Sequence, residues 1–252
     1  MSKEILFGKN AIIEALRAGR EVYKLVVSDQ VLKKEGELRK FINDLGLVPE
    51  VVESKKMKQL VHQRYKISGQ IQGIVAEVAE YEYLDFDVLI ERCKGGKKPV
   101  LLLMLDGLED VHNLGAILRS AEAVGVDAVI IPQNRAVGLS GTVARLSVGA
   151  VEYVPVALVK NLSRAMERLK KEGVWFVGAD ATESQDYREV DMTMAVCIVI
   201  GSEGRGIGRL VGEACDFKVH LPMVGKISSL NASVAAGVLL YEAYSQRNPV
   251  KK

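Results

Sequence analysis

The sequence has few residues that could build a disulfide framework or a metal site. Its 252 residues include three cysteines, Cys93, Cys197 and Cys215, and no two of them have the CxxC spacing. Zinc sites and small disulfide-bonded domains need cysteines at closely defined spacings. The three histidines are scattered along the chain and suggest no metal cluster. We therefore expect neither structural disulfides nor a bound metal.

Long apolar runs are also missing. The longest, PVLLLML (99–105) and MAVCIVI (194–200), are far shorter than the roughly 20 residues that a bilayer-spanning helix needs. The first ten residues lack the basic-then-apolar pattern of a secretion signal. With 48% hydrophobic and 26% charged residues, the composition is that of an ordinary globular protein. We expect a cytoplasmic protein that does not enter membranes.

Complete phosphate-binding and hydrolase motifs are absent. The glycine-rich stretch GSEGRGIG (201–208) fails as a dinucleotide fingerprint, because Arg209 and Val211 stand where further glycines are needed. GKIS (225–228) lacks the hydroxyl residue and the preceding glycine of a P-loop, and no GxSxG motif offers a hydrolase nucleophile. What is left is a glycine-rich loop with Glu203 near its centre.

The positive charge is gathered in the N-terminal part of the chain. The net charge is only +2, yet the first 75 residues hold 14 Lys and Arg against 9 Asp and Glu. The stretch KKMKQLVHQRYK (55–66) contains no acidic residue at all. A basic patch of this kind can bind nucleic-acid phosphates, but it can equally be a solvated helix face. The charge pattern alone leaves both interpretations open.

The first 75 residues alternate helix-like and strand-like patterns. Helical stretches end at Gly19 and Gly46, and β-rich runs cover 21–29, 47–53 and 73–81, with the basic helix before the last of them. The following segment ends in RCKGGKKP, whose glycines, bases and proline are typical of a linker. Its acidic first half is compatible with a short helix. We expect a compact α/β unit followed by a boundary near residues 80–98.

The rest of the chain predicts a mainly parallel sheet covered by helices on both faces. Amphipathic stretches at 113–125 and 161–173 separate strands that are apolar throughout, which is typical of such sheets. The expected strands are 100–106, 127–132, 174–180, 195–201 and 217–222. Polar or glycine-rich loops follow the first, fourth and fifth of these strands. Ligands of open α/β sheets usually bind beyond the carboxyl ends of the strands, so we expect the site there.

Three sequence blocks, in this order, closely resemble the SpoU family of RNA 2′-O-ribose methyltransferases, within the SPOUT superfamily. They are NLGAILRSAEAVGVDAVII (113–131), CIVIGSEGRGI (197–207) and LPMVGKISSLNASVAAGVLLYEAY (221–244). FGKNAIIEAL and QIQGIVAEV near the N-terminus extend the resemblance to the branch that methylates a guanosine of large-subunit ribosomal RNA. One departure is Ile71-Gln72-Gly73, where relatives commonly have His-Gln-Gly.

The resemblance implies an architecture and a cofactor. Residues 1–78 are expected to form an RNA substrate-binding domain similar to ribosomal protein L30e, residues 79–98 a linker, and residues 99–252 a SPOUT methyltransferase domain. That domain would contain a deep trefoil knot and bind S-adenosyl-L-methionine, and the protein would act as a homodimer. General topology rules make knots improbable, so only the resemblance suggests this one.

The resemblance also implies site residues. The catalytic set is Asn113, Arg119, Glu203, Ser229 and Asn231. The positions whose backbone lines the cofactor pocket are Gly201, Leu221 and Leu230. The resemblance assigns Arg119 to the 2′-hydroxyl and an RNA phosphate. Because a guanidinium stays protonated far above neutral pH, we expect it to clamp phosphate and stabilise the developing alkoxide, rather than to act as the base.

Each of these residues also has an ordinary structural explanation. Arg119 can be an exposed helix residue paired with Glu122, and Asn113 can be a helix cap. The last helix can be capped by Ser228 or Ser229. Further along that helix, the residues expected to contribute to a dimer contact are Val238, Leu239, Tyr241 and Glu242.

Three other functions remain as alternatives. A transfer-RNA target within the same family is the nearest. A non-catalytic RNA-binding or ribosome-assembly factor with the same fold is the second, although such a factor would not need all five catalytic residues. An unrelated nucleotide-binding enzyme is the third, and the lack of any complete phosphate motif disfavours it.

Overall fold

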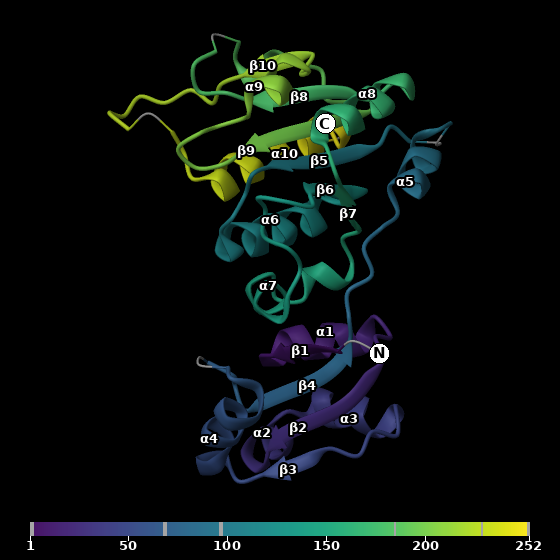
Figure 1. Ribbon diagram of the computed structural model, residues 1–252, viewed down its shortest axis with the longest axis vertical. Helices are drawn as coiled ribbons and strands as arrows, with labels where there is room; N and C mark the ends of the chain where they lie inside the picture. Colours follow the sequence, from purple (N-terminus) through teal and green to yellow (C-terminus); the bar gives the residue numbers. More distant parts are fainter. Residues whose placement is uncertain (1–2, 68–69, 96–97, 184, 228, 251–252) are drawn as a thin grey trace. The chain divides into compact units, whose positions relative to one another are not determined.

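The computed structural model describes residues 3–67, 70–95, 98–183, 185–227 and 229–250. Contacts divide the chain into two compact units (Figure 1). The N-terminal unit contains Met1–Glu82 together with Leu139–Tyr153, and the C-terminal unit contains Tyr83–Gly138 and Val154–Lys252. Among the described residues, no helix is both long enough and apolar enough to cross a membrane.

The N-terminal unit is built on a four-stranded sheet with the order β1-β4-β2-β3. Strand β4 runs antiparallel to both β1 and β2, and β3 runs parallel to β2 at the edge. The strands are β1 (Lys3–Phe7), β2 (Val22–Ser28), β3 (Glu50–Val52) and β4 (Ile74–Ala79). The helices are α1 (Lys9–Arg17), α2 (Asp29–Lys34), α3 (Gly36–Asp44) and α4 (Ser54–Tyr65). Met57 and Val61 of α4 are buried, so the helix packs through one apolar face.

Residues 139–153 complete this unit, although they were expected to belong to a domain spanning 99–252. They form α7 (Gly141–Leu146) and the short 3-10 helix η1 (Ala150–Glu152). The amide of Gly141 donates a hydrogen bond of 2.8 Å to Oε1 of Glu4. Arg20 pairs with Glu152 at 2.9 Å and lies over the ring of Tyr81, with both charged side chains buried. The bounds of the two compact units therefore differ from those of the expected domains, 1–78 and 99–252.

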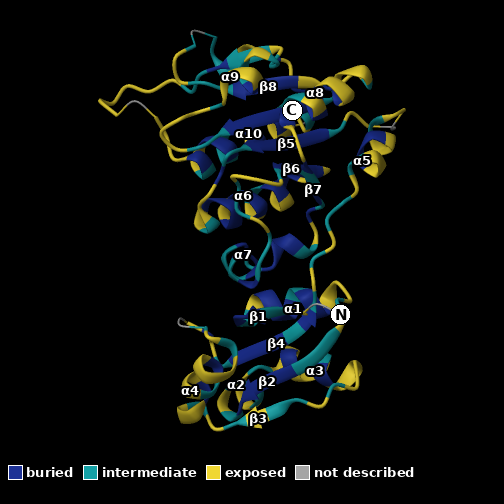
Figure 2. Ribbon diagram, viewed as in Figure 1, coloured by how far each residue is buried: buried dark blue, intermediate teal, exposed yellow. Residues whose placement is uncertain are grey.

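The C-terminal unit is built on a six-stranded, all-parallel sheet with the order β10-β8-β9-β5-β6-β7. The strands are β5 (Leu101–Asp106), β6 (Ala128–Pro132), β7 (Val156–Val159), β8 (Trp175–Ala179), β9 (Val196–Gly201) and β10 (Phe217–Val219). The two central strands, β5 and β9, are buried along almost their whole length (Figure 2). This continuous burial explains why both strands are apolar at every position except the last.

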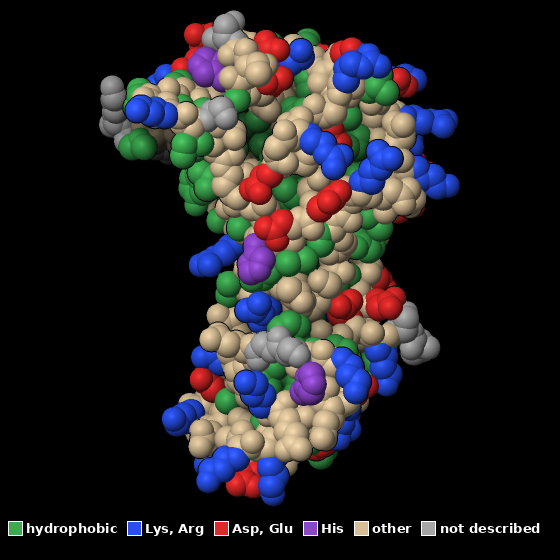
Figure 3. Space-filling view, turned by 60° about the vertical axis from the view of Figure 1, so that its left-hand side comes forward, with side chains coloured by type: hydrophobic (Ala, Val, Ile, Leu, Met, Phe, Trp, Pro, Cys, Tyr) green, Lys and Arg blue, Asp and Glu red, His purple; other side chains and the backbone are tan. Residues whose placement is uncertain are grey.

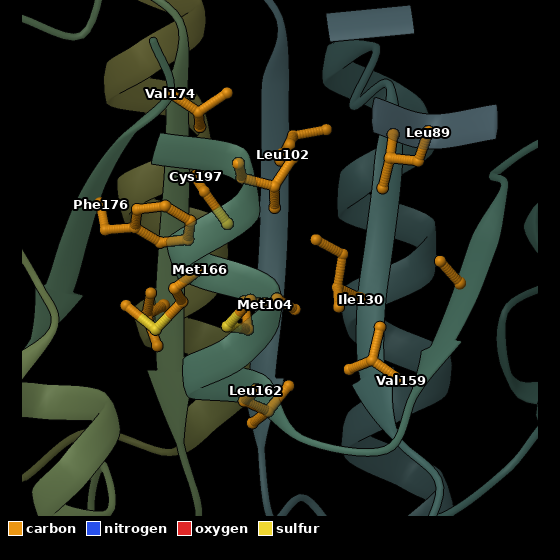
Figure 4. Close-up of a cluster of buried hydrophobic side chains, with 14 of the residues drawn as sticks. Leu89, Leu102, Met104, Ile130, Val159, Leu162, Met166, Val174, Phe176 and Cys197 are labelled. Atoms are coloured by element: carbon orange, nitrogen blue, oxygen red, sulfur yellow. The ribbon is translucent and has the colours of Figure 1, made fainter. Parts of the chain in front are cut away.

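Helices cover both faces of this sheet. They are α5 (Phe86–Cys93), α6 (Val111–Val124), α8 (Leu162–Lys171), α9 (Arg209–Glu213) and α10 (Ala232–Arg247). On one face, Met166 of α8 packs among Met104, Ile130 and Phe176 of the strands (Figure 4). On the other face, α10 packs against α6 and β9.

The predicted α/β fold with a mainly parallel sheet is confirmed. Each of the five expected strands of the C-terminal part is present, although the last is shorter than predicted. The sequence interpretation missed β1, α2, α7 and β7, whereas α5 confirms the short helix expected in the acidic half of the boundary segment. The trefoil knot stays a prediction.

Candidate active site

The candidate site lies where β5 and β9 end. These strands are parallel neighbours, and their last residues, Asp106 and Gly201, are directly paired. The loops that follow them therefore leave the same edge of the sheet. Oδ2 of Asp106 accepts a 2.7 Å hydrogen bond from the amide of Gly208, which caps α9. This bond ties the end of β5 to the far end of the loop that follows β9.

The glycine-rich loop after β9 closes into a tight turn that presents Glu203. Ser202 and Gly206 exchange two backbone hydrogen bonds, of 3.1 and 2.9 Å. Gly204 and Gly206 have positive φ angles of 84° and 66°, which other residues rarely adopt. A side chain at Gly201 would overlap the backbone of Gly206 and Ile207, so only glycine fits there. The glycines are thus explained by the shape of the turn.

Three of the five predicted catalytic residues form one hydrogen-bonded cluster. Nδ2 of Asn113 donates to Oε1 of Glu203 at 3.1 Å, and Nδ2 of Asn231 donates to Oδ1 of Asn113 at 2.9 Å. Nδ2 of Asn231 also donates to the same oxygen of Glu203. We call Asn113, Glu203 and Asn231 the Asn–Glu–Asn cluster. Each member comes from a different one of the three sequence blocks, so residues up to 118 positions apart meet here.

Asn231 has a second task, as the N-cap of α10. Its Oδ1 accepts hydrogen bonds from the amides of Ser233 and Val234, at 3.0 and 3.3 Å. The expectation that Ser229 caps this helix is therefore wrong, and Ser228 lies outside the described residues. Side chains of Asn are among the best N-caps because their oxygen satisfies amides that have no helical partner. One amide side chain thus joins the helix start to the Asn–Glu–Asn cluster.

Asn113 lies inside α6 rather than capping it. Asp110 is the N-cap, and its side chain accepts a 2.9 Å hydrogen bond from the amide of His112. Asn113 is only 5% exposed, which makes it one of the few buried polar residues. A buried amide that lost its partners would be destabilising, so its bonds to the other two cluster residues are structurally needed.

The other two predicted catalytic residues stand apart from these contacts. Arg119 is exposed on α6, and Ser229 is exposed in the loop before α10. In the described part of the chain, neither side chain is hydrogen-bonded to the Asn–Glu–Asn cluster, and Arg119 forms no ion pair with Glu122. The guanidinium of Arg119 is therefore available to a ligand.

The three predicted cofactor positions lie at or just beyond the ends of elements of this unit. Gly201 ends β9, Leu221 follows β10, and Leu230 immediately precedes the N-cap of α10. Leu230 is 40% exposed, and Met223 and Ile227 of the same loop are also exposed. This long loop thus presents several apolar side chains.

The cysteines are unsuited to nucleophilic chemistry. Burial raises the pKa of Cys93 to about 11 and that of Cys215 to about 12, and it also raises the pKa of the fully buried Cys197. A thiol with such a pKa stays protonated at neutral pH, and the thiolate is the reactive form. Within the described ranges, no group of three or more His, Cys, Asp or Glu could hold a metal ion.

A fourth loop at this edge was missed by the sequence interpretation. Residues 133–138 follow β6, and a side chain on Gly107 would lie 3.9 Å from the carbonyl oxygen of Arg135 and 3.8 Å from Cβ of Ser202. Arg135 also has a positive φ of 57°. The signal available in the sequence was the polar run Gln-Asn-Arg directly after a strand that ends in proline.

The expected dimer residues on α10 differ in exposure. Leu239 is fully buried within its own unit, so the expectation that it contributes to a dimer contact is wrong. Tyr241 is 54% exposed, and Val238 is half-buried. Glu242 accepts a 2.9 Å hydrogen bond from Gln246 of the same helix.

Comparisons with protein families match almost the whole chain. Residues 100–241 match the SpoU rRNA Methylase family, and residues 5–84 match the family of RNA 2′-O ribose methyltransferase substrate-binding domains. The chain is 47% identical over 248 residues to the "Putative TrmH family tRNA/rRNA methyltransferase YacO" of Bacillus subtilis (strain 168). The matched segment covers 98% of this chain and 97% of the relative.

Solved structures share the fold. The SpoU methyltransferase AviRb of Streptomyces viridochromogenes, solved in complex with the cofactor AdoMet, matches with a TM-score of 0.80 at 24% identity over 97% of this chain and 90% of AviRb. An RNA 2′-O ribose methyltransferase matches with a TM-score of 0.76 at 28% identity over 97% of this chain and 89% of the other. The chain belongs to the SpoU rRNA methylase family of RNA 2′-O-methyltransferases.

Proposed function

We propose that this protein transfers a methyl group from S-adenosyl-L-methionine to the 2′-hydroxyl of a guanosine ribose in 23S ribosomal RNA. The observation that carries the proposal is the Asn–Glu–Asn cluster, in which one residue from each family block meets at the carboxyl edge of the sheet. A protein that only bound RNA would have no need for a carboxylate held by two amides.

The residues of the site suit the cofactor. S-adenosylmethionine supplies a methyl group on a positively charged sulfur, which makes it electrophilic. Backbone groups at Gly201, Leu221 and Leu230 would hold it, and the exposed apolar side chains of Met223 and Ile227 suit its nucleoside and thioether parts. The AdoMet complex of AviRb supports this assignment by analogy. We include the trefoil knot of the family in the proposal.

Arg119 is assigned to the RNA phosphate and to the reacting oxygen. Its guanidinium can form two parallel hydrogen bonds to a phosphate, which fixes the position of the strand. As the 2′-hydroxyl loses its proton, the same positive charge stabilises the developing alkoxide. Arg119 is not assigned to removing the proton, because a guanidinium group stays protonated far above neutral pH.

Glu203 is assigned to orienting the ribose. One of its carboxylate oxygens already accepts hydrogen bonds from Asn113 and Asn231, which fixes the direction of the carboxylate. The other oxygen, Oε2, can accept a hydrogen bond from the ribose or pair with Arg119. Ser229, which is exposed in the loop before α10, is assigned to orienting the reacting part of the cofactor. Alignment of the two reactants supplies much of the rate enhancement in such displacements.

RNA binding is assigned to α4 of the N-terminal unit. Lys55 and Lys58 of α4 are exposed and three residues apart, so they are neighbours on the helix surface, and exposed Lys66 is the C-cap that directly follows the helix. Figure 3 shows Lys and Arg side chains spread over the visible face of this unit. Removing the charges of Lys55 and Lys58 should weaken RNA binding and lower its salt dependence. An unchanged salt dependence would mean that this face is merely solvated.

The homodimer is assigned to the exposed side of α10. Val234, Tyr241 and Tyr244 are each more than 40% exposed, and they recur at helical spacing. Exposed apolar residues grouped in this way often mark a contact surface. Light scattering should give twice the monomer mass, and Tyr241→Glu should give the monomer. We also expect the protein to be cytoplasmic.

The test of the proposed function is Arg119→Ala. It should abolish methyl transfer from labelled cofactor to RNA while leaving cofactor affinity within a few-fold, because Arg119 is assigned to RNA. Lys171→Ala, at an exposed position in the last turn of α8, is the control for charge and should transfer normally. A normal rate with Arg119→Ala would overturn the assigned roles.

The RNA target is tested separately. Mapping 2′-O-methyl groups on ribosomal and transfer RNA from a strain that lacks this protein should show one missing guanosine methyl group in 23S RNA. A missing methyl group in transfer RNA would support the alternative substrate. An unchanged pattern, together with no binding of S-adenosylmethionine, would support a non-catalytic RNA-binding factor.

A further inference from the structure

Arg135 adopts a backbone conformation that an arginine rarely takes. Its φ of 57° lies in the left-handed region, and it is the only described non-glycine residue of the C-terminal unit with such an angle. Glycine or asparagine occupies this region at lower energy. Backbone strain of this kind persists only when neighbouring contacts enforce it, and it is concentrated at functional sites.

The loop that contains Arg135 is fixed at both ends. The amide of Gln133 donates to the carbonyl of Val159 at 2.9 Å, and the amide of Val137 donates to the carbonyl of Leu108 at 2.8 Å. These bonds attach the loop to the end of β7 and to the turn after β5. The position of Arg135 is therefore set by the sheet itself.

Arg135 lies beside the turn that presents Glu203. A side chain on Gly107 would contact both the carbonyl oxygen of Arg135 and Ser202, so these two residues border the same small space. Ser202 is the residue immediately before Glu203. The loop after β6 thus borders the loop that carries the Asn–Glu–Asn cluster.

The side chain of Arg135 is exposed and has no partner within the described ranges. The acidic residue Glu109 follows Leu108 in the adjacent turn. The side chains of Arg135 and Glu109 nevertheless form no ion pair. Arg205, in the turn of Glu203, is also exposed and forms no ion pair with a described residue. Exposed guanidinium groups on two bordering loops favour binding of a polyanion.

We propose that Arg135 binds a phosphate of the RNA strand next to the nucleotide that is methylated. This inference rests on the proposed function, and it adds a positioning residue outside the five catalytic residues. A guanidinium matches two oxygens of a phosphate, and its distance from the cluster residues is set by a loop fixed to the sheet. The strained backbone is the observation that separates Arg135 from an ordinary solvated arginine.

The left-handed backbone allows a clean test, because Arg135→Gly removes the guanidinium without opposing the conformation. RNA binding by the full-length protein should weaken about tenfold, the loss of one charge-assisted contact. The slope of log affinity against log salt should fall by about 0.7 to 0.9. The melting temperature should stay the same or rise, and the affinity for S-adenosylmethionine should be unchanged.

Two further variants complete the test. Arg135→Lys should restore the salt slope, because it keeps the charge, but only part of the affinity, because it lacks the second hydrogen bond. Lys171→Ala removes one positive charge from the far end of α8 and should change neither quantity. Under saturating RNA, Arg135→Gly should methylate near the wild-type rate, which separates positioning from catalysis.

Several results would overturn the inference. Wild-type affinity and slope in Arg135→Gly would show that the side chain is only solvated. A loss of S-adenosylmethionine affinity would show that the guanidinium serves the cofactor carboxylate instead. If the wild-type protein bound RNA but transferred no methyl group, the proposed function would fail, while the salt slope would still decide the role of Arg135.

Discussion

Asn231 offers a way to separate the stability of the last helix from the chemistry of the site. Its side-chain oxygen caps α10, and its side-chain nitrogen donates to Asn113 and Glu203. Asn231→Ala removes both functions. Asn231→Ser keeps a good N-cap but has no amide that reaches the other two residues.

The expected magnitudes follow from these contacts. Loss of the cap costs about 1 kcal/mol of unfolding free energy. Loss of the Asn231 amide leaves the buried side-chain carbonyl of Asn113 without its hydrogen-bond donor, which costs about 1–3 kcal/mol of unfolding free energy. Glu203 is exposed and can be hydrated, so it adds little. Asn231→Ala should therefore lose about 2–4 kcal/mol, and Asn231→Ser about 1 kcal/mol less than that.

Chemical denaturation and methyl transfer would check both parts. The two variants should differ in unfolding free energy but should lose activity to a similar extent, because both remove one of the two amide donors that hold the carboxylate of Glu203. Equal stability of the two variants would refute the capping argument. A wild-type rate with Asn231→Ser would refute the idea that the amide orients Glu203 for catalysis.

Three further predictions concern the fold and its pH dependence. Gly201→Ala should abolish cofactor binding in calorimetry, because the new methyl group overlaps the backbone of the following turn, whereas Gly212→Ala should bind normally, because its added methyl group meets only an ordinary contact at 3.8 Å. Arg20→Met should lower the unfolding free energy of the N-terminal unit by about 3–5 kcal/mol in denaturant titration, because it leaves Glu152 as a buried charge without its partner. Neighbouring Arg and Lys side chains lower the pKa of Glu50 from 4.5 to about 2, so its contribution to stability is present above pH 4.5 and is lost as the pH falls toward 2. Glu50→Gln should remove that part of the acid dependence in melting curves.

Each of these predictions has a result that contradicts it. Normal cofactor binding by Gly201→Ala would mean that the turn can move aside. An Arg20→Met variant as stable as the wild type would mean that the pair contributes nothing. For Glu50, which is about one-third exposed, an unaltered acid dependence in the glutamine variant would show that solvent screens the ion pairs.

The sequence predicted the sheet well because its strands are buried on both faces. Apolar runs such as VLLLMLD have no other stable place in a protein of this size, and glycines marked the helix ends. The strand β7 was missed because it is only four residues long and directly follows Pro155. Periodicity needs a longer segment to distinguish a strand from a loop.

The residues of the candidate site were predicted from the family resemblance. The hydrogen bonds between them could not be predicted from the sequence. No pattern in the sequence shows that Asn231 reaches Asn113, because that contact depends on how loops 118 residues apart fold over the sheet edge. Local rules misassigned the caps of both helices for a related reason. The backbone conformation places the side chains of Asp110 and Asn231, and not those of their neighbours, where they can accept hydrogen bonds from the first amides of each helix. Residue propensity alone does not predict this conformation.

The packing of residues 139–153 with the N-terminal sheet bears on how domains can be exchanged between relatives. A chimaera cut near residue 80 would pair a foreign sheet with an α7 shaped for this one, where Gly141 leaves no room for a side chain beside Ile5. A donor domain should therefore be transplanted together with its own counterpart of 139–153. A directed change of RNA specificity in this family would then require that two separate stretches of the gene are replaced together.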